Sequence, residues 1–373
     1  MKKGAIIVVI VVAVLIIAAA IGIPLYMYNQ NNYVAKVGDA KITEAEYKFY
    51  LMNFKENVES LVGVSGSDSD TIKSFWKSKA NTDGETWEEY AKKYTLDQLK
   101  KNKVMLAKAK EKDITLTKDE KNNIKEEIDN VVTQYYGGKR VEADKAYKSN
   151  YGVNLSQYET IAKEKTLIEK YQSKVYSELA DEITDDEISQ AYNEDPKQYD
   201  KISVRHILYL TVDLTTGESL TEGEVNEASE KANAMKAKVL AGEDMAKLAK
   251  ENSQDPYVEE NEGLVIYDKY GIYDKNGNLT ATFASSGYDY GESFYEWAKD
   301  KKVGDVEIIE TMFGYHVMKV ENRVTQTLDE VKGHIKDEFI QSKFESKLEE
   351  WIKDTKYTLV MNDEVYNKIK IIE

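Results

Sequence analysis

Two short segments decide the fold of this chain: Ile202-Ser203-Val204-Arg205-His206-Ile207-Leu208-Tyr209-Leu210 and Phe313-Gly314-Tyr315-His316-Val317-Met318-Lys319-Val320. Both are dense in β-branched, aromatic and aliphatic residues and contain no proline, which predicts β-strands. Each carries one of the three histidines of the 373-residue sequence. A strand histidine among branched aliphatics is expected to point into a packed interior, where a neutral imidazole needs a hydrogen-bond partner. A second imidazole can be that partner, so we expect His206 and His316 to meet.

Three further segments lie between these strands: a helix end at Leu248-Ala249-Lys250-Glu251-Asn252-Ser253-Gln254-Asp255, then Phe294-x-x-Trp297-Ala298, then Val303-Gly304-Asp305-Val306. In this order and spacing, the five segments resemble the parvulin class of peptidyl-prolyl isomerase over about a third of the chain. The flanking segments resemble those of the extracytoplasmic foldases of the PrsA and SurA type, in which a helical chaperone domain surrounds a parvulin insert.

The resemblance implies an α+β fold with four parts along the chain. These are a transmembrane signal anchor at residues 1–32, the N-terminal part of an all-α chaperone domain at 33–198, a parvulin-like domain at 199–323, and a C-terminal helix and tail at 324–373. The last part is expected to complete a discontinuous chaperone domain. The parvulin-like domain is expected to hold a four-stranded antiparallel sheet with helices.

The resemblance also implies the site. His206 and His316 would form paired imidazoles at the floor of a proline pocket, and Asp255 would lie near the carbonyl that rotates. The residues that the resemblance assigns to substrate binding are Leu264, Tyr290, Phe294, Thr311 and Phe313. Rotation about an Xaa-Pro bond faces a barrier of about 18–20 kcal/mol, because resonance gives the C–N bond double-bond character. The reaction neither breaks nor forms a covalent bond, so no cofactor is expected.

Each assignment has a structural alternative that the sequence leaves open. The two strand histidines could be a purely structural pair that fixes the sheet. Asp255 precedes Pro256 at a helix end, which is also ordinary turn chemistry. Phe294 and Phe313 could be core aromatics. Two histidines without a third ligand at a known spacing do not indicate a metal site, and His334, in a helix rich in lysine and acid, is expected at the surface.

Three features depart from the family pattern. Tyr290 stands where many members carry methionine, only Gly263 remains of a glycine-rich turn, and the segment from Ile266 to Tyr290 exceeds the family minimum. Within that segment, Asn276-Gly277 predicts a hairpin turn. The segment could cover the pocket as a lid or block it. The alternative function is therefore a membrane-anchored holdase chaperone whose parvulin-like domain binds chains without turnover.

One sequence pattern predicts helix starts repeatedly along the chain. The capping-box pattern Thr-x-x-Glu begins at Thr43, Thr86, Thr117, Thr184, Thr221 and Thr327. Apolar residues repeat at helical spacing after these starts and are expected to form the core of a helical domain. Part of this tyrosine-rich surface could instead line a groove for unfolded chains. Short strands are expected near residues 34–42 and in the tail from 357 to 372.

The N-terminal segment predicts a membrane anchor. Lys2 and Lys3 precede an uncharged run from Gly4 to Tyr28, which exceeds the ~20 residues needed to cross a bilayer. Positive charge before the span keeps the N-terminus in the cytoplasm, so the folded part is expected outside the cell membrane. Small residues at Ala18-Ala19-Ala20 leave a cleaved signal peptide as the alternative. The apolar run continues beyond that point, which favours the uncleaved anchor.

The amino-acid composition excludes several classes of binding partner and of chemistry. The formal net charge of −16 argues against nucleic acid, since phosphate binding needs a basic face. The absence of cysteine excludes disulfides, thiolate catalysis and attachment through a lipid-modified cysteine. We therefore expect an anchored foldase for unfolded or partly folded secreted polypeptides with Xaa-Pro bonds. A homodimer is left open, and a scaffold for one dedicated partner is a third hypothesis.

Overall fold

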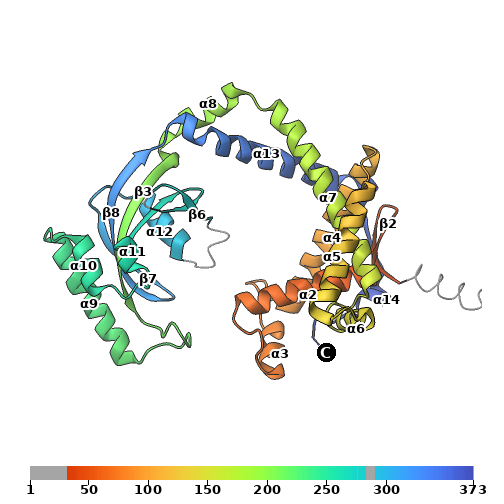
Figure 1. Cartoon of the computed structure of the whole chain (residues 1–373), viewed down its shortest axis with the longest axis horizontal. Helices are drawn as coiled ribbons and strands as arrows, with labels where there is room; N and C mark the ends of the chain where they lie inside the picture. The colour runs from red at the N-terminus through yellow and green to blue at the C-terminus, as the bar shows by residue number, and fades with distance from the viewer. Residues whose placement is uncertain (1–31, 275, 283–289, 373) are drawn as a thin grey trace, which may run out of the picture. The chain divides into compact units, whose positions relative to one another are not determined.

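The computed structural model describes residues 32–274, 276–282 and 290–372. The chain divides into two compact units (Figure 1). We call them the helical unit, which contains the chain up to Glu182 and Ile340–Glu373, and the sheet unit, Ile183–Phe339. The domain boundaries expected at residues 199 and 323 stay predictions. The segments just outside these two boundaries also contact each other, because the hydroxyl of Tyr192 donates a hydrogen bond to the carbonyl of Gln326 at 2.8 Å.

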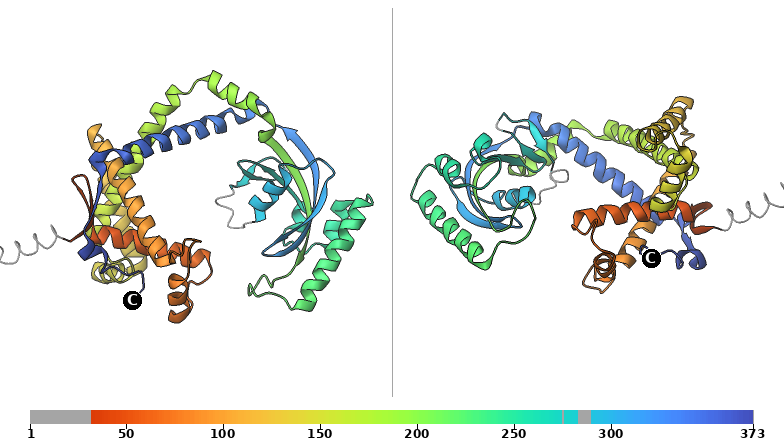
Figure 2. Two further views of the ribbon diagram at one scale, coloured as in Figure 1. Left: turned by 180° about the vertical axis from the view of Figure 1, so that it is seen from behind. Right: turned by 60° about the horizontal axis from the view of Figure 1, so that its bottom comes forward.

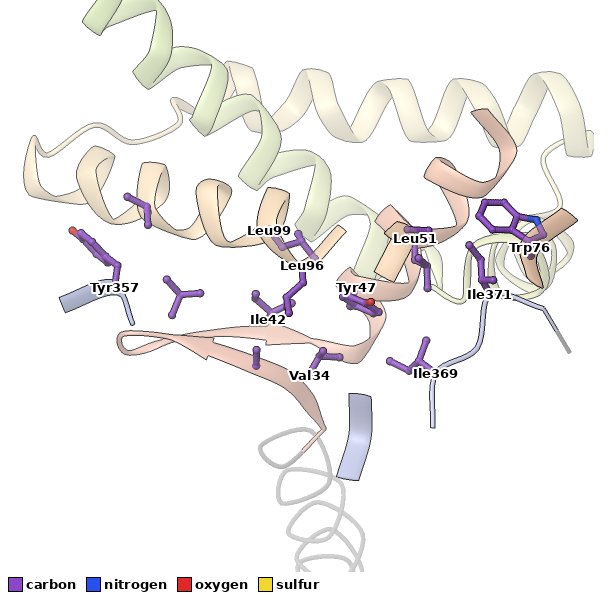
Figure 3. Close-up of a cluster of buried hydrophobic side chains, with 14 residues drawn as sticks. Val34, Ile42, Tyr47, Leu51, Trp76, Leu96, Leu99, Tyr357, Ile369 and Ile371 are labelled. Carbon is purple, nitrogen blue, oxygen red and sulfur yellow. The ribbon is translucent and has the colours of Figure 1, made fainter. Parts of the chain in front are cut away.

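The helical unit takes its elements from both ends of the chain. They are β1 (Tyr33–Val37), β2 (Ala40–Thr43), α2 (Glu44–Leu61), α3 (Ser69–Lys77), α4 (Trp87–Glu111), α5 (Lys118–Tyr136), α6 (Arg140–Tyr151), α7 (Leu155–Glu182), the later part of α13 (Leu328–Lys353), a 3-10 turn (Thr355–Tyr357), β9 (Leu359–Met361) and α14 (Asp363–Tyr366). Its core joins side chains of the N-terminal elements, such as Tyr47 and Leu99, to Ile369 and Ile371 of the tail (Figure 3).

A small antiparallel sheet in the order β2-β1-β9 brings the two ends of the chain together. Gly38 forms the turn between β1 and β2 at φ +55°, where a Cβ atom would lie 2.6 Å from the Lys356 carbonyl oxygen. The prediction of an all-α chaperone domain is therefore wrong for this unit. The physical reason is that β-branched residues such as Val34 and Ile42 pair as strands while burying their side chains on the helices.

The predicted capping boxes are confirmed as helix starts. Four are complete in both directions: those at Thr86, Thr117, Thr184 and Thr221. At the start of α2, the Thr43 hydroxyl accepts from the Glu46 N–H at 3.1 Å. At the start of α13, the Thr327 N–H donates to the Glu330 carboxylate at 2.7 Å. Each box satisfies backbone groups that a helix end leaves without an intrahelical partner.

The sheet unit is built on one antiparallel sheet between helices. Its elements are α8 (Asp185–Glu194), a 3-10 turn (Pro196–Tyr199), β3 (Asp200–Leu210), α9 (Glu222–Leu240), α10 (Met245–Asn252), α11 (Val258–Asn261), β4 (Leu264–Asp268), β5 (Gly271–Tyr273), β6 (Leu279–Ala281), α12 (Tyr290–Ala298), β7 (Val306–Thr311), β8 (Gly314–Thr325) and the first part of α13. The strand order is β6-β5-β4-β3-β8-β7.

The expected four-stranded sheet is thus a six-stranded one. The two added strands, β5 and β6, form the hairpin that Asn276-Gly277 predicted, on the outer edge of β4. Gly277 has φ +84°, and the Asp274 carboxylate accepts the backbone N–H groups of Asn276 and Asn278 at 2.8 and 2.9 Å. The long segment therefore adds two strands to the sheet, which end at Ala281. The part of the segment after residue 282, including Ser285-Ser286-Gly287, lies outside the described residues.

Strand alternation sorts the side chains of the sheet onto two faces. Ile207, Tyr209 and Val317 pack against α9 and α10 on one face. Val204 and Met318 pack with α12, which Figures 1 and 2 show on the other face. The pairing of β3 with β8 is irregular at Ser203/Val204 and regular after it. From Val204 on, the even-numbered residues of β3 therefore lie on the α12 face together with the even-numbered residues of β8. This places both strand histidines on the α12 face.

The predicted membrane anchor at residues 1–32 lies outside the described part of the chain, except for Asn32. Among residues 32–274, 276–282 and 290–372, no helix combines the length and the apolar character that a bilayer crossing requires.

We predict that Thr117→Ala lowers the free energy of unfolding by about 1 kcal/mol, because the first turn of α5 loses its side-chain cap. Denaturant unfolding followed by circular dichroism measures the loss. Thr133→Ala is the matched control, since this threonine lies inside the same helix and bonds only the Asp129 carbonyl there. Equal losses in the two variants would contradict the assignment of a cap at Thr117.

Candidate active site

The register of β3 against β8 sets the distance between the two histidines. Leu208 is the direct partner of His316, and His206 is the direct partner of Met318. The histidines are therefore diagonal neighbours on one face, a spacing that long or aromatic side chains can bridge. Their Nδ1 atoms lie 3.2 Å apart. The structure thus brings together the two imidazoles that lie more than a hundred residues apart in the sequence.

The histidine pair belongs to a chain of polar contacts. The Thr311 Oγ1 lies 2.9 Å from His316 Nε2 and accepts the Phe313 N–H at 3.2 Å. At the other end, His206 Nε2 lies 2.8 Å from Asp255 Oδ2, a close contact that departs from the line of the N–H bond. When both rings are neutral and the carboxylate can only accept, one proton arrangement fits these contacts. Thr311 donates to His316, His316 Nδ1 donates to His206 Nδ1, and His206 Nε2–H faces Asp255.

Burial and the contact with His206 set the charge states of His316 and Asp255. Removal from water, with a smaller effect of His206, lowers the pKa of His316 to about 3, so this imidazole is neutral at ordinary pH. Burial opposes ionisation of Asp255, but its hydrogen bond and charge interaction with His206 keep the pKa of the carboxyl below 3.8. The site therefore combines a neutral imidazole with a buried carboxylate.

Asp255 is held in place by the two residues before it. The Ser253 hydroxyl accepts the Leu208 N–H at 3.0 Å and the Asp255 N–H at 3.2 Å. The Gln254 N–H donates to the Leu208 carbonyl at 2.9 Å, and its side-chain oxygen accepts the Leu210 N–H at 2.8 Å. This turn is thus bonded to β3 just beyond His206. From the sequence, Ser253 and Gln254 were expected only to end a helix.

A cavity of about 270 Å³ lies against the histidine pair, and we call it the proline cavity. It is lined by His206, Leu208, Leu214, Asp255, Pro256, Tyr257, Phe313 and His316. Four of these were absent from the predicted site: Leu208, Leu214, Pro256 and Tyr257. The alternation of β3 could have found Leu208, two residues from His206. Leu214 comes from a loop whose path the sequence does not reveal.

The remaining predicted site residues fall in different places. Leu264 is half-buried and lines a neighbouring hollow with His206 and Asp255. Phe294 is fully buried, and its ring packs edge-on against both imidazoles, with centroids 5.3 Å from His206 and 4.8 Å from His316. Tyr290 begins α12, but its side chain lies outside the described residues.

The third histidine lies away from this site. His334 is exposed on α13, as expected, and its ring stacks on Tyr270 with centroids 4.1 Å apart. Within the described residues, no group of three or more histidine, cysteine or acidic side chains is arranged to hold a metal ion.

Comparison with known proteins gives matches over both units. Residues 187–324 match the family model of the PPIC-type PPIase domain, and residues 1–172 match that of the SurA-like N-terminal domain. The foldase protein PrsA of Caldanaerobacter subterraneus subsp. tengcongensis is 26% identical over 328 residues, which cover 87% of this chain and 85% of that protein. The foldase protein PrsA of Clostridium botulinum strain Hall is 27% identical over 277 residues, or 71% and 72% of the two chains.

Among solved structures, foldase protein PrsA from Streptococcus pneumoniae aligns over 90% of this chain and 99% of its own, at 16% identity. Its TM-score of 0.33 is too low to bear on the fold. The match of residues 187–324 defines the class: this is a parvulin-type peptidyl-prolyl cis-trans isomerase. The chain belongs to the foldases of the PrsA and SurA type, which combine this isomerase with chaperone activity in the folding of secreted proteins.

We predict that the free energy of unfolding falls as the pH is lowered from 6.5 toward 3. In the unfolded chain His316 binds a proton near its ordinary pKa of 6.5, whereas in the folded chain it stays neutral down to about 3. The stability from neutral burial is thus complete above pH 6.5 and is lost as the pH falls. The slope is up to about 1.4 kcal/mol per pH unit. Denaturant unfolding at a series of pH values measures it.

The variant His316→Gln keeps a polar side chain but removes the titrating ring, so it should show a shallower dependence between pH 6.5 and 3. His334→Gln is the matched control and should keep the full slope, because this ring is exposed on α13. An unchanged slope in His316→Gln would contradict the neutral burial of His316.

Proposed function

We propose that the proline cavity is the isomerase site and that His206, His316 and Asp255 are its catalytic residues. The observation that carries this proposal is the continuous polar chain from Thr311 to Asp255 beside an apolar cavity. Leu208, Leu214 and Phe313 offer apolar surface for a pyrrolidine ring. Thr311 acts from behind His316, and Phe294 packs under both imidazoles as a positioning residue.

Two physical effects would lower the rotation barrier in this site. A planar amide carries partial negative charge on its oxygen through resonance, whereas the twisted amide has lost that resonance. A buried Asp255 carboxylate near the carbonyl oxygen disfavours the planar form more than the twisted form. An apolar, water-poor cavity acts in the same direction, because it withholds the solvation that stabilises the more polar planar amide. The neutral His316 ring contacts His206, which in turn contacts the carboxylate and holds it in place.

A proline-peptide isomerisation assay tests these roles. We expect His206→Ala and Asp255→Ala each to lower kcat/KM by at least about tenfold, since each removes a group that faces the rotating bond. Thr311→Val should lower kcat/KM by less, because it disturbs only the hydrogen bond behind His316. His334→Ala is the matched histidine control and should keep the wild-type rate. Wild-type rates in His206→Ala and Asp255→Ala would sink the catalytic assignment.

We also propose that residues 1–32 anchor the chain in the cell membrane as a single pass, with the folded part outside the cytoplasm. Lys2 and Lys3 before the uncharged run from Gly4 to Tyr28 support this orientation. The substrates are then unfolded or partly folded polypeptides that have crossed the membrane, and pairing of two copies would be compatible with this arrangement.

Mass spectrometry of the chain recovered from a membrane fraction tests the anchor, and we expect the intact N-terminus. A chain that begins after Ala18-Ala19-Ala20 would overturn the uncleaved anchor in favour of a cleaved signal peptide. Digestion of intact cells with a protease that cleaves after lysine tests the orientation, and we expect it to cleave the folded part. Full protection of the folded part from cleavage would contradict an orientation outside the cytoplasm.

A further inference from the structure

A second hollow, of about 780 Å³, adjoins the proline cavity. The linings of the two share His206, Asp255 and Tyr257. The other walls of this hollow come mainly from β4, α11 and the added β5–β6 hairpin. A peptide whose proline lies over the histidines therefore has the hollow within reach of a neighbouring side chain. We call it the flanking hollow.

The flanking hollow is acidic. Among the described residues, its lining contains one arginine, Arg205, and four carboxylates, on Asp255, Glu260, Glu262 and Asp274. The net formal charge of these groups is −3. A cationic side chain is attracted into such a hollow and an anionic one is repelled, and the low-dielectric wall strengthens both effects.

Two cations at or beside the hollow, Arg205 and Lys250, are already paired with carboxylates. Arg205 Nε lies 3.0 Å from the Glu321 carboxylate, which is not part of the lining. The Glu262 carboxylate pairs with Lys250 at 2.6 Å. Among the described residues, no lysine or arginine lies within ion-pair distance of Glu260 or Asp274. Asp274 accepts three hydrogen bonds from Asn276 and Asn278, but its negative charge, like that of Glu260, is not neutralised by a described cation.

The remaining walls suit a long side chain with a charged end. Leu264, Val265 and Ile272 supply apolar surface for an aliphatic stem. Tyr257 supplies a ring face, which attracts cations, and the Tyr273 ring already contacts a cation of the chain itself. Lys201 shows this preference within the protein itself, because its Nζ lies 4.2 Å from the centre of the Tyr273 ring.

We infer that the flanking hollow is a subsite for a lysine or arginine side chain on the residue just before the isomerised proline. This rests on the proposed function, in which Asp255 faces the carbonyl that rotates. That carbonyl belongs to the residue before the proline, so the side chain of the same residue is the one nearest to Asp255 and to the hollow behind it. Substrates with a basic residue before proline are thereby selected over those with an acidic one.

The test uses the full chain and four peptides that differ only in the residue before proline, namely lysine, arginine, alanine or glutamate. We expect kcat/KM for the lysine and arginine peptides to exceed that for the glutamate peptide by about tenfold at low ionic strength. The ratio should shrink as salt is added, because exposed charges are screened.

Two variants locate the preference. Glu260→Gln and Asp274→Asn each remove one carboxylate from the lining, and asparagine can still accept the backbone hydrogen bonds that hold the β5–β6 turn. Each should reduce the ratio of lysine to glutamate peptide by at least about twofold. Glu259→Gln is the matched control, since Glu259 is exposed on the same helix α11 but does not line the hollow, and it should leave the ratio unchanged.

The outcomes separate this inference from the proposed function. If the wild-type chain accelerates none of the four peptides, the proposed function fails. If it accelerates all four equally, or the glutamate peptide most, the isomerase site stands and the basic subsite is overturned. A lysine preference that survives in both Glu260→Gln and Asp274→Asn also overturns the assignment to this hollow.

Discussion

The structure depends on one constraint: two imidazoles are buried on adjacent strands and must satisfy each other. A buried ring nitrogen without a partner costs free energy, so His206 and His316 are stable on the α12 face only as a hydrogen-bonded pair. Their pairing in turn requires a donor at one outer nitrogen and an acceptor at the other. Thr311, the last residue of β7, and Asp255, in a turn bonded to β3, supply these groups.

Backbone packing around the pair leaves little freedom. Gly263 has φ +73°, and a Cβ there would lie 2.3 Å from the His206 carbonyl oxygen. The His206 N–H donates to the Gly263 carbonyl at 2.9 Å, which fixes β4 beside β3 at this level. At the second strand, a Cβ on Gly314 would lie 2.1 Å from the Tyr209 carbonyl oxygen. Each of the two histidine strands is therefore approached by a backbone segment at a position where only glycine fits. Gly263 is also the one glycine that remains of the family's glycine-rich turn.

Much of this arrangement could be predicted from the sequence, because the signals were local or were carried by the family pattern. The capping boxes gave the helix starts, and the spacing of five segments gave the isomerase unit with His206, His316 and Asp255. The roles of Ser253 and Gln254 could not be predicted, since they depend on how a turn docks on β3. The strand count was missed because the resemblance describes the shared core, whereas β5 and β6 belong to this chain's longer segment.

The most direct test of the account is nitrogen NMR of the chain with labelled histidines, which reports the proton position on each ring. The account predicts that His316 carries its proton on Nδ1, that His206 carries its proton on Nε2, and that His316 stays neutral at pH 5. A His316 ring that titrates near 6.5, or that carries its proton on Nε2, would contradict the neutral burial of His316 and the proton arrangement from Thr311 to Asp255.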